Sequence, residues 1–224
     1  MRTLRFIACL FAGTLALVAD PSEKSAAPMT EPVSAAGSEP DSAARSWSGS
    51  VSAMGYLVPD GQSYGQPTVA ADRDWLHLEA RYNYEGLETG SFWVGYNLHF
   101  GDRLTLDLTP MLGGVVGNTR GVAPGLEATL AWWKLEWYGE MEYVADLGDS
   151  DASYFYLWSE VSVSPLKWFR VGGVAQRTRV YETDVDVQRG FLAGLQFDPV
   201  AFTTYLFNPA QNRPTIVMAL SVSF

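Results

Sequence analysis

The last ten residues of the chain alternate between apolar and small or polar side chains up to the final residue. Ile216, Met218, Leu220, Val222 and Phe224 occupy every second position, which is the spacing that places side chains on one face of a β-strand. The last residues of most soluble domains fray. A strand that continues to the last residue therefore predicts that this end of the chain is held in a sheet.

This strand resembles the closing strand of bacterial outer-membrane β-barrels, in which a terminal phenylalanine follows apolar residues at alternate positions. The resemblance implies an all-β fold, an antiparallel transmembrane β-barrel, and localisation in the bacterial outer membrane. It also implies that Phe224 is an assembly signal read by the barrel-assembly machinery during biogenesis. Outer-membrane lipid and lipopolysaccharide would then surround the protein.

The first nineteen residues have the pattern of a secretory signal peptide. Arg2 and Arg5 precede an apolar run over residues 6–19, and that run is too short for a spanning helix, which needs about 20 apolar residues. The single cysteine, Cys9, lies inside this run. The sequence therefore predicts an exported protein whose mature chain has no disulfide.

Composition divides the rest of the chain into two parts. Residues 20–46 are rich in Pro, Ser, Ala and Glu without aromatics, which predicts a disordered linker because so little apolar surface is available for burial. All eight Trp and all eleven Tyr fall in residues 47–224, the predicted barrel domain.

Net charge and hydropathy limit the partners and the fold. Without residues 1–19 the chain has 13 basic and 25 acidic residues, a net charge of −12, which argues against nucleic acid as a partner. No later segment has 18 consecutive apolar residues, and only helices and closed barrels span a bilayer. A membrane-embedded form of this chain must therefore be a barrel.

Ten segments with strand-like alternation predict a barrel of about ten strands, with eight to twelve compatible with the sequence. These segments are residues 75–85, 91–100, 103–112, 125–133, 135–146, 153–164, 167–181, 186–198, 200–208 and 214–224. Residues 47–58 also alternate, although bacterial barrels have even strand numbers. Either this segment packs at the rim or in the lumen, or residues 64–71 add a twelfth strand; we favour ten crossings with an extra N-terminal piece.

Aromatic residues near strand ends favour a membrane barrel over a soluble secreted ligand-binding barrel, because aromatic girdles mark both membrane interfaces. Counting back from a periplasmic C-terminus places nine of them near periplasmic turns: Phe100, Trp132, Trp133, Trp137, Trp168, Phe169, Phe197, Phe202 and Phe224. A second belt is expected near the opposite strand ends, from Tyr82, Tyr84, Phe92, Tyr143, Phe155, Tyr181 and Phe207.

The polar strand positions predict an acidic lumen. We expect a charge network there that comprises Glu79, Arg81, Asp107, Glu127, Glu136, Glu140, Glu142, Glu160 and Arg170. Crowded carboxylates need counter-ions, and Arg81 and Arg170 are the candidates. The network is interpreted either as an ion-pair filling of a narrow barrel or as a cation-selective constriction, since rings of Asp or Glu favour cations.

Two histidines and three arginines complete the candidate residues. His77 and His99 occupy lumen positions on neighbouring strands and suggest an alternative function as an outer-leaflet lipid-modifying enzyme, but no catalytic triad, metal motif or cofactor motif accompanies them. Arg177, Arg179 and Arg189 lie near outer strand ends, where they can contact lipopolysaccharide phosphates or pair with Glu182, Asp184 and Asp186. The sequence thus favours a non-enzymatic, narrow porin-like channel or a structural barrel.

Overall fold

The computed structural model describes residues 46–59, 61–148, 150–180 and 186–224. The predicted signal peptide and nearly all of the predicted linker fall outside these residues. The described elements are β1 (Ser48–Leu57), β2 (Tyr64–Arg73), β3 (Leu76–Tyr82), β4 (Thr89–Tyr96), β5 (Leu98–Phe100), β6 (Leu104–Gly117), β7 (Gly121–Trp132), β8 (Leu135–Asp146), η1 (Ser150–Ala152), β9 (Tyr154–Leu166), β10 (Phe169–Val180), β11 (Asp186–Phe197), β12 (Val200–Phe207) and β13 (Thr215–Ser223).

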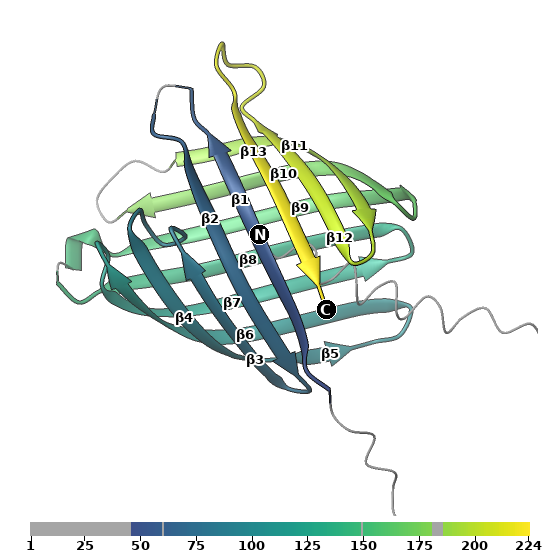
Figure 1. The fold of residues 1–224 in the computed structure, drawn as a ribbon, viewed down its shortest axis with the longest axis horizontal. Helices are drawn as coiled ribbons and strands as arrows, with labels where there is room; N and C mark the ends of the chain where they lie inside the picture. Colours follow the sequence, from purple (N-terminus) through teal and green to yellow (C-terminus); the bar gives the residue numbers. More distant parts are fainter. Residues whose placement is uncertain (1–45, 60, 149, 181–185) are drawn as a thin grey trace, which may run out of the picture.

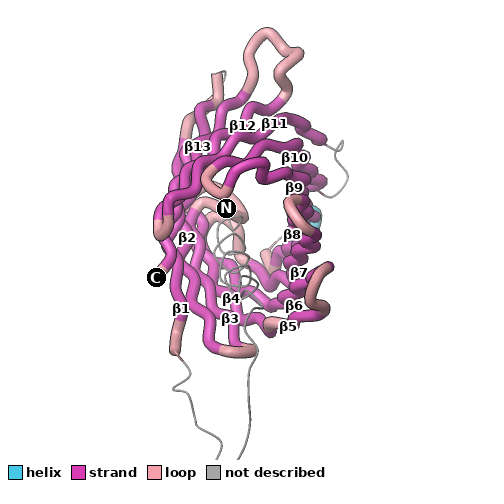
Figure 2. The backbone as a smooth tube through the Cα atoms, turned by 90° about the vertical axis from the view of Figure 1, so that its right-hand side faces the viewer, coloured by secondary structure: helices cyan, strands magenta, loops and turns pink. Residues whose placement is uncertain are grey.

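The strands form one closed antiparallel barrel (Figures 1 and 2). Apart from β4 and β5, each strand pairs with its neighbours in the sequence, and β1 pairs with β13 to join the two ends of the sheet. Both β4 and β5 pair with β6 and are separated by Asn97, so they are two parts of one strand. The thirteen strand segments therefore make twelve barrel strands.

Twelve strands lie within the predicted range of eight to twelve, but the favoured arrangement of ten crossings was wrong. The segment at residues 47–58 is not an extra piece at the rim or in the lumen, because β1 is the strand that closes the barrel against β13. The segment at residues 64–71 belongs to β2, which pairs with both β1 and β3. The alternative in which residues 64–71 add a twelfth strand is therefore the correct one, and the strand number is even.

The two ends of the barrel differ in the length of their connections. At the end that carries Phe224, which we call the turn end, the connections at residues 74–75, 101–103, 133–134, 167–168 and 198–199 have two or three residues. At the opposite end, the loop end, they have three to seven residues. Outer-membrane barrels have short periplasmic turns and longer extracellular loops, so this asymmetry agrees with the direction counted back from the C-terminus.

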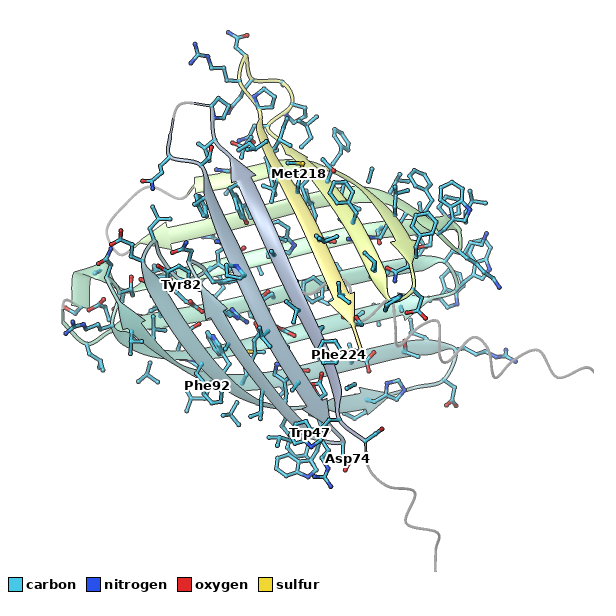
Figure 3. The ribbon with its side chains drawn as sticks, viewed as in Figure 1. Trp47, Asp74, Tyr82, Phe92, Met218 and Phe224 are labelled. Atoms are coloured by element: carbon cyan, nitrogen blue, oxygen red, sulfur yellow. The ribbon has the colours of Figure 1, made fainter. Side chains whose placement is uncertain are left out.

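The outer face of the barrel is apolar. Met218, Leu220 and Phe92 are 40%, 51% and 55% exposed, and Figure 3 shows such side chains standing away from the strands. A soluble barrel would bury this face and expose the polar one. In this barrel the apolar side chains face outward and the charged strand residues are buried inside. This distribution argues against a soluble secreted barrel.

Exposed aromatic side chains gather at the turn end. They include Trp75, Phe100, Trp132, Trp133, Trp168, Phe197 and Phe224. The second belt is less complete than expected, because Tyr84 and Phe207 pack inside the barrel. Asn83 has a positive φ of 55°, so the alternation of β3 does not continue to Tyr84. Phe207 lies on the same face of β12 as the buried Tyr205, and Tyr181 lies outside the described residues.

Among the described residues, no helix combines the length and the apolar character needed to cross a membrane.

Candidate functional site: the charged lumen

Arg81 lies at the centre of a cluster of carboxylates inside the barrel, which we call the Arg81 network. Its guanidinium nitrogens lie within 4 Å of five glutamates, which come from β3, the β3–β4 loop, β7 and β8. The closest nitrogen–oxygen distances are 2.5 Å to Glu79, 2.9 Å to Glu140, 3.1 Å to Glu142, 3.7 Å to Glu85 and 3.7 Å to Glu127. β3 and β8 are not neighbours in the sheet, so Arg81 reaches across the lumen.

Two aromatic rings also hold the guanidinium of Arg81. Its Cζ lies 4.2 Å from the ring centroid of Tyr84 and 4.6 Å from that of Trp93, which are distances typical of cation–π contacts. Trp93 lies flat against the barrel wall, because a side chain at Gly113 or Gly125 would come within 3 Å of its ring. The two glycines therefore make room for Trp93, and Trp93 positions Arg81.

The Arg81 network has more carboxyl groups than cations. The side chains of Arg81, Glu79, Glu140 and Glu142 are at most 3% exposed, so water screens their charges weakly. One guanidinium faces five carboxyl groups, and Glu127 lies directly opposite Glu140 across the strand pair. Like charges opposite each other destabilise a sheet, so the guanidinium of Arg81, which lies within 4 Å of both glutamates, offsets the repulsion between them.

Aromatic side chains fill the lumen beside the network and donate hydrogen bonds to its acids. Tyr138 Oη donates to Glu140 at 3.1 Å, and Trp93 Nε1 donates to Glu85 at 3.1 Å. Large polar aromatics keep a hydrogen-bond partner when buried. These contacts leave the lumen narrow at this depth.

Arg170 forms a second, separate charge site. It contacts Glu160 at 3.1 Å, and Trp158 Nε1 and Tyr205 Oη donate to the same carboxylate at 2.8 and 3.0 Å. Glu136 is also buried, and it pairs with Ser162 on β9, the strand that carries Glu160. Apart from Asp107, the sequence-predicted lumen charges thus divide between Arg81 and Arg170.

The two histidines do not form a joint site. His77 Nδ1 lies 2.6 Å from Asp72 and its Nε2 lies 3.4 Å from Glu79, so His77 extends the Arg81 network. His99 is 62% exposed at the turn end and lies 2.6 Å from Asp107. Asp107 therefore lies with His99 and apart from the other predicted lumen acids. His77 pairs with Gly95, and the four residues from there to His99 span about 13 Å of strand.

Among the described residues, no group of three His, Cys, Asp or Glu side chains is arranged to hold a metal ion.

Two of the three predicted arginines, Arg177 and Arg189, lie on the outer face near the loop end. Val174 is buried and Gln176 faces a lumen cavity, so alternation turns Arg177 outward. Arg189 is exposed and follows Gln188, which faces the same cavity. Arg179 belongs to β10, but its side chain lies outside the described part of the structure, as do the side chains of Glu182, Asp184 and Asp186.

A cavity of about 480 Å³ opens at the loop end of the lumen, and we call it the vestibule. Tyrosines, amides and two acids form its wall: Tyr56, Tyr64, Gln66, Asn83, Tyr84, Glu85, Gly86, Leu87, Glu142, Tyr154, Tyr156, Gln176 and Gln188. Glu85 and Glu142 also belong to the Arg81 network, so the network borders the vestibule directly. A much smaller cavity of about 20 Å³ lies beside Arg170 towards the turn end, which is room for about one water molecule.

Several residues of these sites were missed by the sequence prediction. Glu85 shares the alternation of Glu79 and Arg81, and this signal was available, but it lies beyond the end of β3 in a loop. Asp72 was missed because β2 was not assigned as a crossing. The aromatic hydrogen-bond donors have no sequence signal beyond their inward strand positions.

Comparisons with known proteins show which solved structures have a similar fold. No protein-family model and no curated protein matches the chain. Two solved structures of the KdgM porin, one in complex with disordered oligogalacturonate, are similar to it, with TM-scores of 0.56 and 0.57, 10% identity, and coverage of 78% of this chain and 99% of theirs. Acinetobacter baumannii Omp33 has a TM-score of 0.48 at 11% identity, over 80% of this chain and 98% of Omp33. The likeness to KdgM and the apolar outer face agree that the chain has the fold of a porin-like outer-membrane β-barrel, as its terminal strand predicted.

Proposed function

We propose that this protein is a narrow channel of the bacterial outer membrane that prefers cations. The observation that carries the proposal is the cluster of five glutamates within 4 Å of a single arginine in the lumen. Rings of acidic side chains favour cations in pores, and buried charges act more strongly than exposed ones. An ion that enters from the vestibule meets Glu85 and Glu142 first.

The acidic lumen does not suit the kind of ligand that one of the similar structures contains. KdgM porin is solved with oligogalacturonate, which is a polyanion. The same solute would meet like charge at the Arg81 network, and like-charge contacts disfavour binding. We therefore infer that this channel passes small cations or cationic solutes rather than acidic oligosaccharides.

Conductance in a planar bilayer tests the proposal. We expect small single-channel currents. In a KCl gradient, the reversal potential should lie closer to the equilibrium potential of K⁺ than to that of Cl⁻. The Glu142→Gln variant should reduce this cation preference, because it removes one carboxylate that borders both the vestibule and the network. Each preparation should first show the heat-dependent gel migration of a folded barrel.

The matched control is Glu88→Gln, since Glu88 is an exposed acid of the β3–β4 loop at the same end of the barrel. It should leave the reversal potential unchanged. A folded barrel that carries no current would contradict the channel and favour a purely structural barrel. A conducting barrel that prefers anions would contradict the proposed cation preference.

We also propose that Arg177 and Arg189 bind lipopolysaccharide phosphates. Both side chains lie on the outer face within three residues of the loop-end limits of their strands, and arginine suits phosphate contact. Charges on a lipid-facing surface cost little free energy near the interface. The sites are therefore at a depth where an arginine is tolerated and lipid phosphates are within reach.

Lipopolysaccharide should protect the folded barrel against heat, and the Arg177→Gln/Arg189→Gln double variant should lose much of that protection. The unfolding temperature on gels, with and without added lipopolysaccharide, measures it. The Arg103→Gln variant changes an exposed arginine at the turn end and should keep full protection. Equal protection of all three proteins would contradict the assignment.

A further inference from the structure

Several hydrogen-bond donors of the vestibule wall are already used within the protein. Gln66 Nε2 donates to the carbonyl of Asn83 at 2.7 Å, Asn83 Nδ2 donates to that of Gly65 at 3.0 Å, and Gln176 Nε2 donates to Gln188 Oε1 at 2.8 Å. The Tyr154 hydroxyl donates to the carbonyl of Glu85. Much of the donor capacity of the wall is therefore used within the protein.

Two acceptor oxygens remain in the same wall. Gln66 Oε1 and Glu85 Oε2 are shielded from water and accept no hydrogen bond within the described part of the chain, although their residues are only 6% and 5% exposed. Buried polar atoms normally have a partner. A solute that donates hydrogen bonds supplies such a partner once a side-chain rotation turns the oxygen towards the vestibule.

Five tyrosine rings add a second preference to the vestibule. Tyr56 and Tyr64 are stacked with centroids 4.7 Å apart, and Tyr84 and Tyr156 meet edge to face at 5.8 Å. Aromatic faces attract cations, and the guanidinium of Arg81 already lies over Tyr84. The acids Glu85 and Glu142 supply the negative charge next to these rings.

We propose that the vestibule binds an organic ammonium ion with N–H donors, such as a linear polyamine, which would be the substrate class of the channel. This inference rests on the proposed channel for its transport role, but the binding itself does not depend on conduction. A cavity of about 480 Å³ lies within the range of small-molecule sites. The stacked rings contact the ammonium groups and the alkyl segments next to them, and the acids and amide oxygens accept the N–H groups.

A neutral sugar fits this wall less well. Sugar hydroxyls both donate and accept hydrogen bonds, and they need donors from the protein, many of which are already used here. The two acids would also be desolvated by a neutral ligand without a compensating charge. The tyrosines alone would suit either a sugar or an ammonium ion. The acceptor oxygens and the acids are the groups that favour the ammonium ion.

Calorimetric titration of the full-length protein in detergent with spermidine tests the site. Saturable binding is expected, with weaker binding of tetramethylammonium, which lacks N–H donors, and none of trehalose. Tyr64→Leu should weaken spermidine binding about threefold to thirtyfold, the range for a lost cation–π contact. Tyr64→Phe, which keeps the ring, should bind nearly as well as the unmodified protein, and Tyr82→Leu, on the outer face, should bind equally well.

The outcomes separate the site from the channel. Trehalose binding as tight as that of spermidine, or spermidine binding unchanged by Tyr64→Leu, would overturn the ammonium site even if the barrel conducts. Spermidine binding that depends on the Tyr64 ring, in a barrel that carries no current, would support the site and contradict the channel. Gel migration of each variant confirms that a folded barrel is being titrated.

Discussion

Replacement of Arg81 by methionine is expected to lower the free energy of unfolding by about 3–5 kcal/mol, as measured for broken buried ion pairs. Methionine keeps much of the length and apolar volume of the side chain, so the main change is the loss of the cation. Five carboxyl groups would then face one another without the guanidinium that now contacts all of them. Urea unfolding in lipid vesicles, followed by tryptophan fluorescence, measures the change.

The effect of Arg81→Met should depend on pH in a defined direction. Every ionised glutamate of the cluster repels the others more strongly when the guanidinium is absent, and protonation at lower pH removes that repulsion. The stability difference from the unmodified protein should therefore shrink as the pH falls. Adding Glu142→Gln to Arg81→Met should recover part of the loss at neutral pH.

The outward arginine Arg177 provides the control for this experiment. Arg177→Met should change the free energy of unfolding by less than about 1 kcal/mol, as is usual for surface positions. An Arg81→Met barrel as stable as Arg177→Met at neutral pH would show that the carboxyl groups are not held together by Arg81. A pH-independent loss would instead indicate a packing effect next to Trp93.

The alternation of the sequence was sufficient to assign most strands and the face that each presents. It was not sufficient to count β1 and β2 among the crossings of the barrel, for a physical reason. The inward positions of β1 include Met54 and Tyr56 beside Ser50 and Ser52, so its two faces differ little in polarity. Pro67 lies within β2, and a proline in the sequence usually argues against a strand that has neighbours on both sides.

The sequence could place the lumen acids on the inner face, but not assign their partners. From the sequence alone, Arg81 and Arg170 were equally good counter-ions for any of these acids. Their roles diverge because Arg81 reaches across the barrel to β8 while Arg170 contacts Glu160 on the adjacent β9. Contacts across a lumen depend on strand number and stagger, which alternation alone does not determine. The same reason explains why the vestibule could not be foreseen.

We propose that Phe224 acts as the assembly signal of this barrel, and Phe224→Ala should lower the amount of folded protein in the outer membrane severalfold. The backbone of Phe224 closes the barrel, because its N–H donates to Gly49 at 2.9 Å and its carbonyl accepts from Gly49 at 2.7 Å. Both bonds survive the substitution. The phenyl ring is 76% exposed, so its loss removes little buried area. Heat-dependent gel migration of outer-membrane fractions measures the folded amount.

Two comparisons distinguish a signal from a structural anchor. Trp133 lies at the same end and is 78% exposed, so Trp133→Ala removes a similar interfacial ring and should leave the folded amount nearly unchanged. Purified Phe224→Ala should also refold from urea into detergent as well as the unmodified chain. The ring does pack over Gly49, where a Cβ would come within 2.6 Å of it. If refolding without the assembly machinery fell as much as the amount in cells, the ring would act through this closing contact between β1 and β13, and the terminal phenylalanine would be a structural residue rather than a signal.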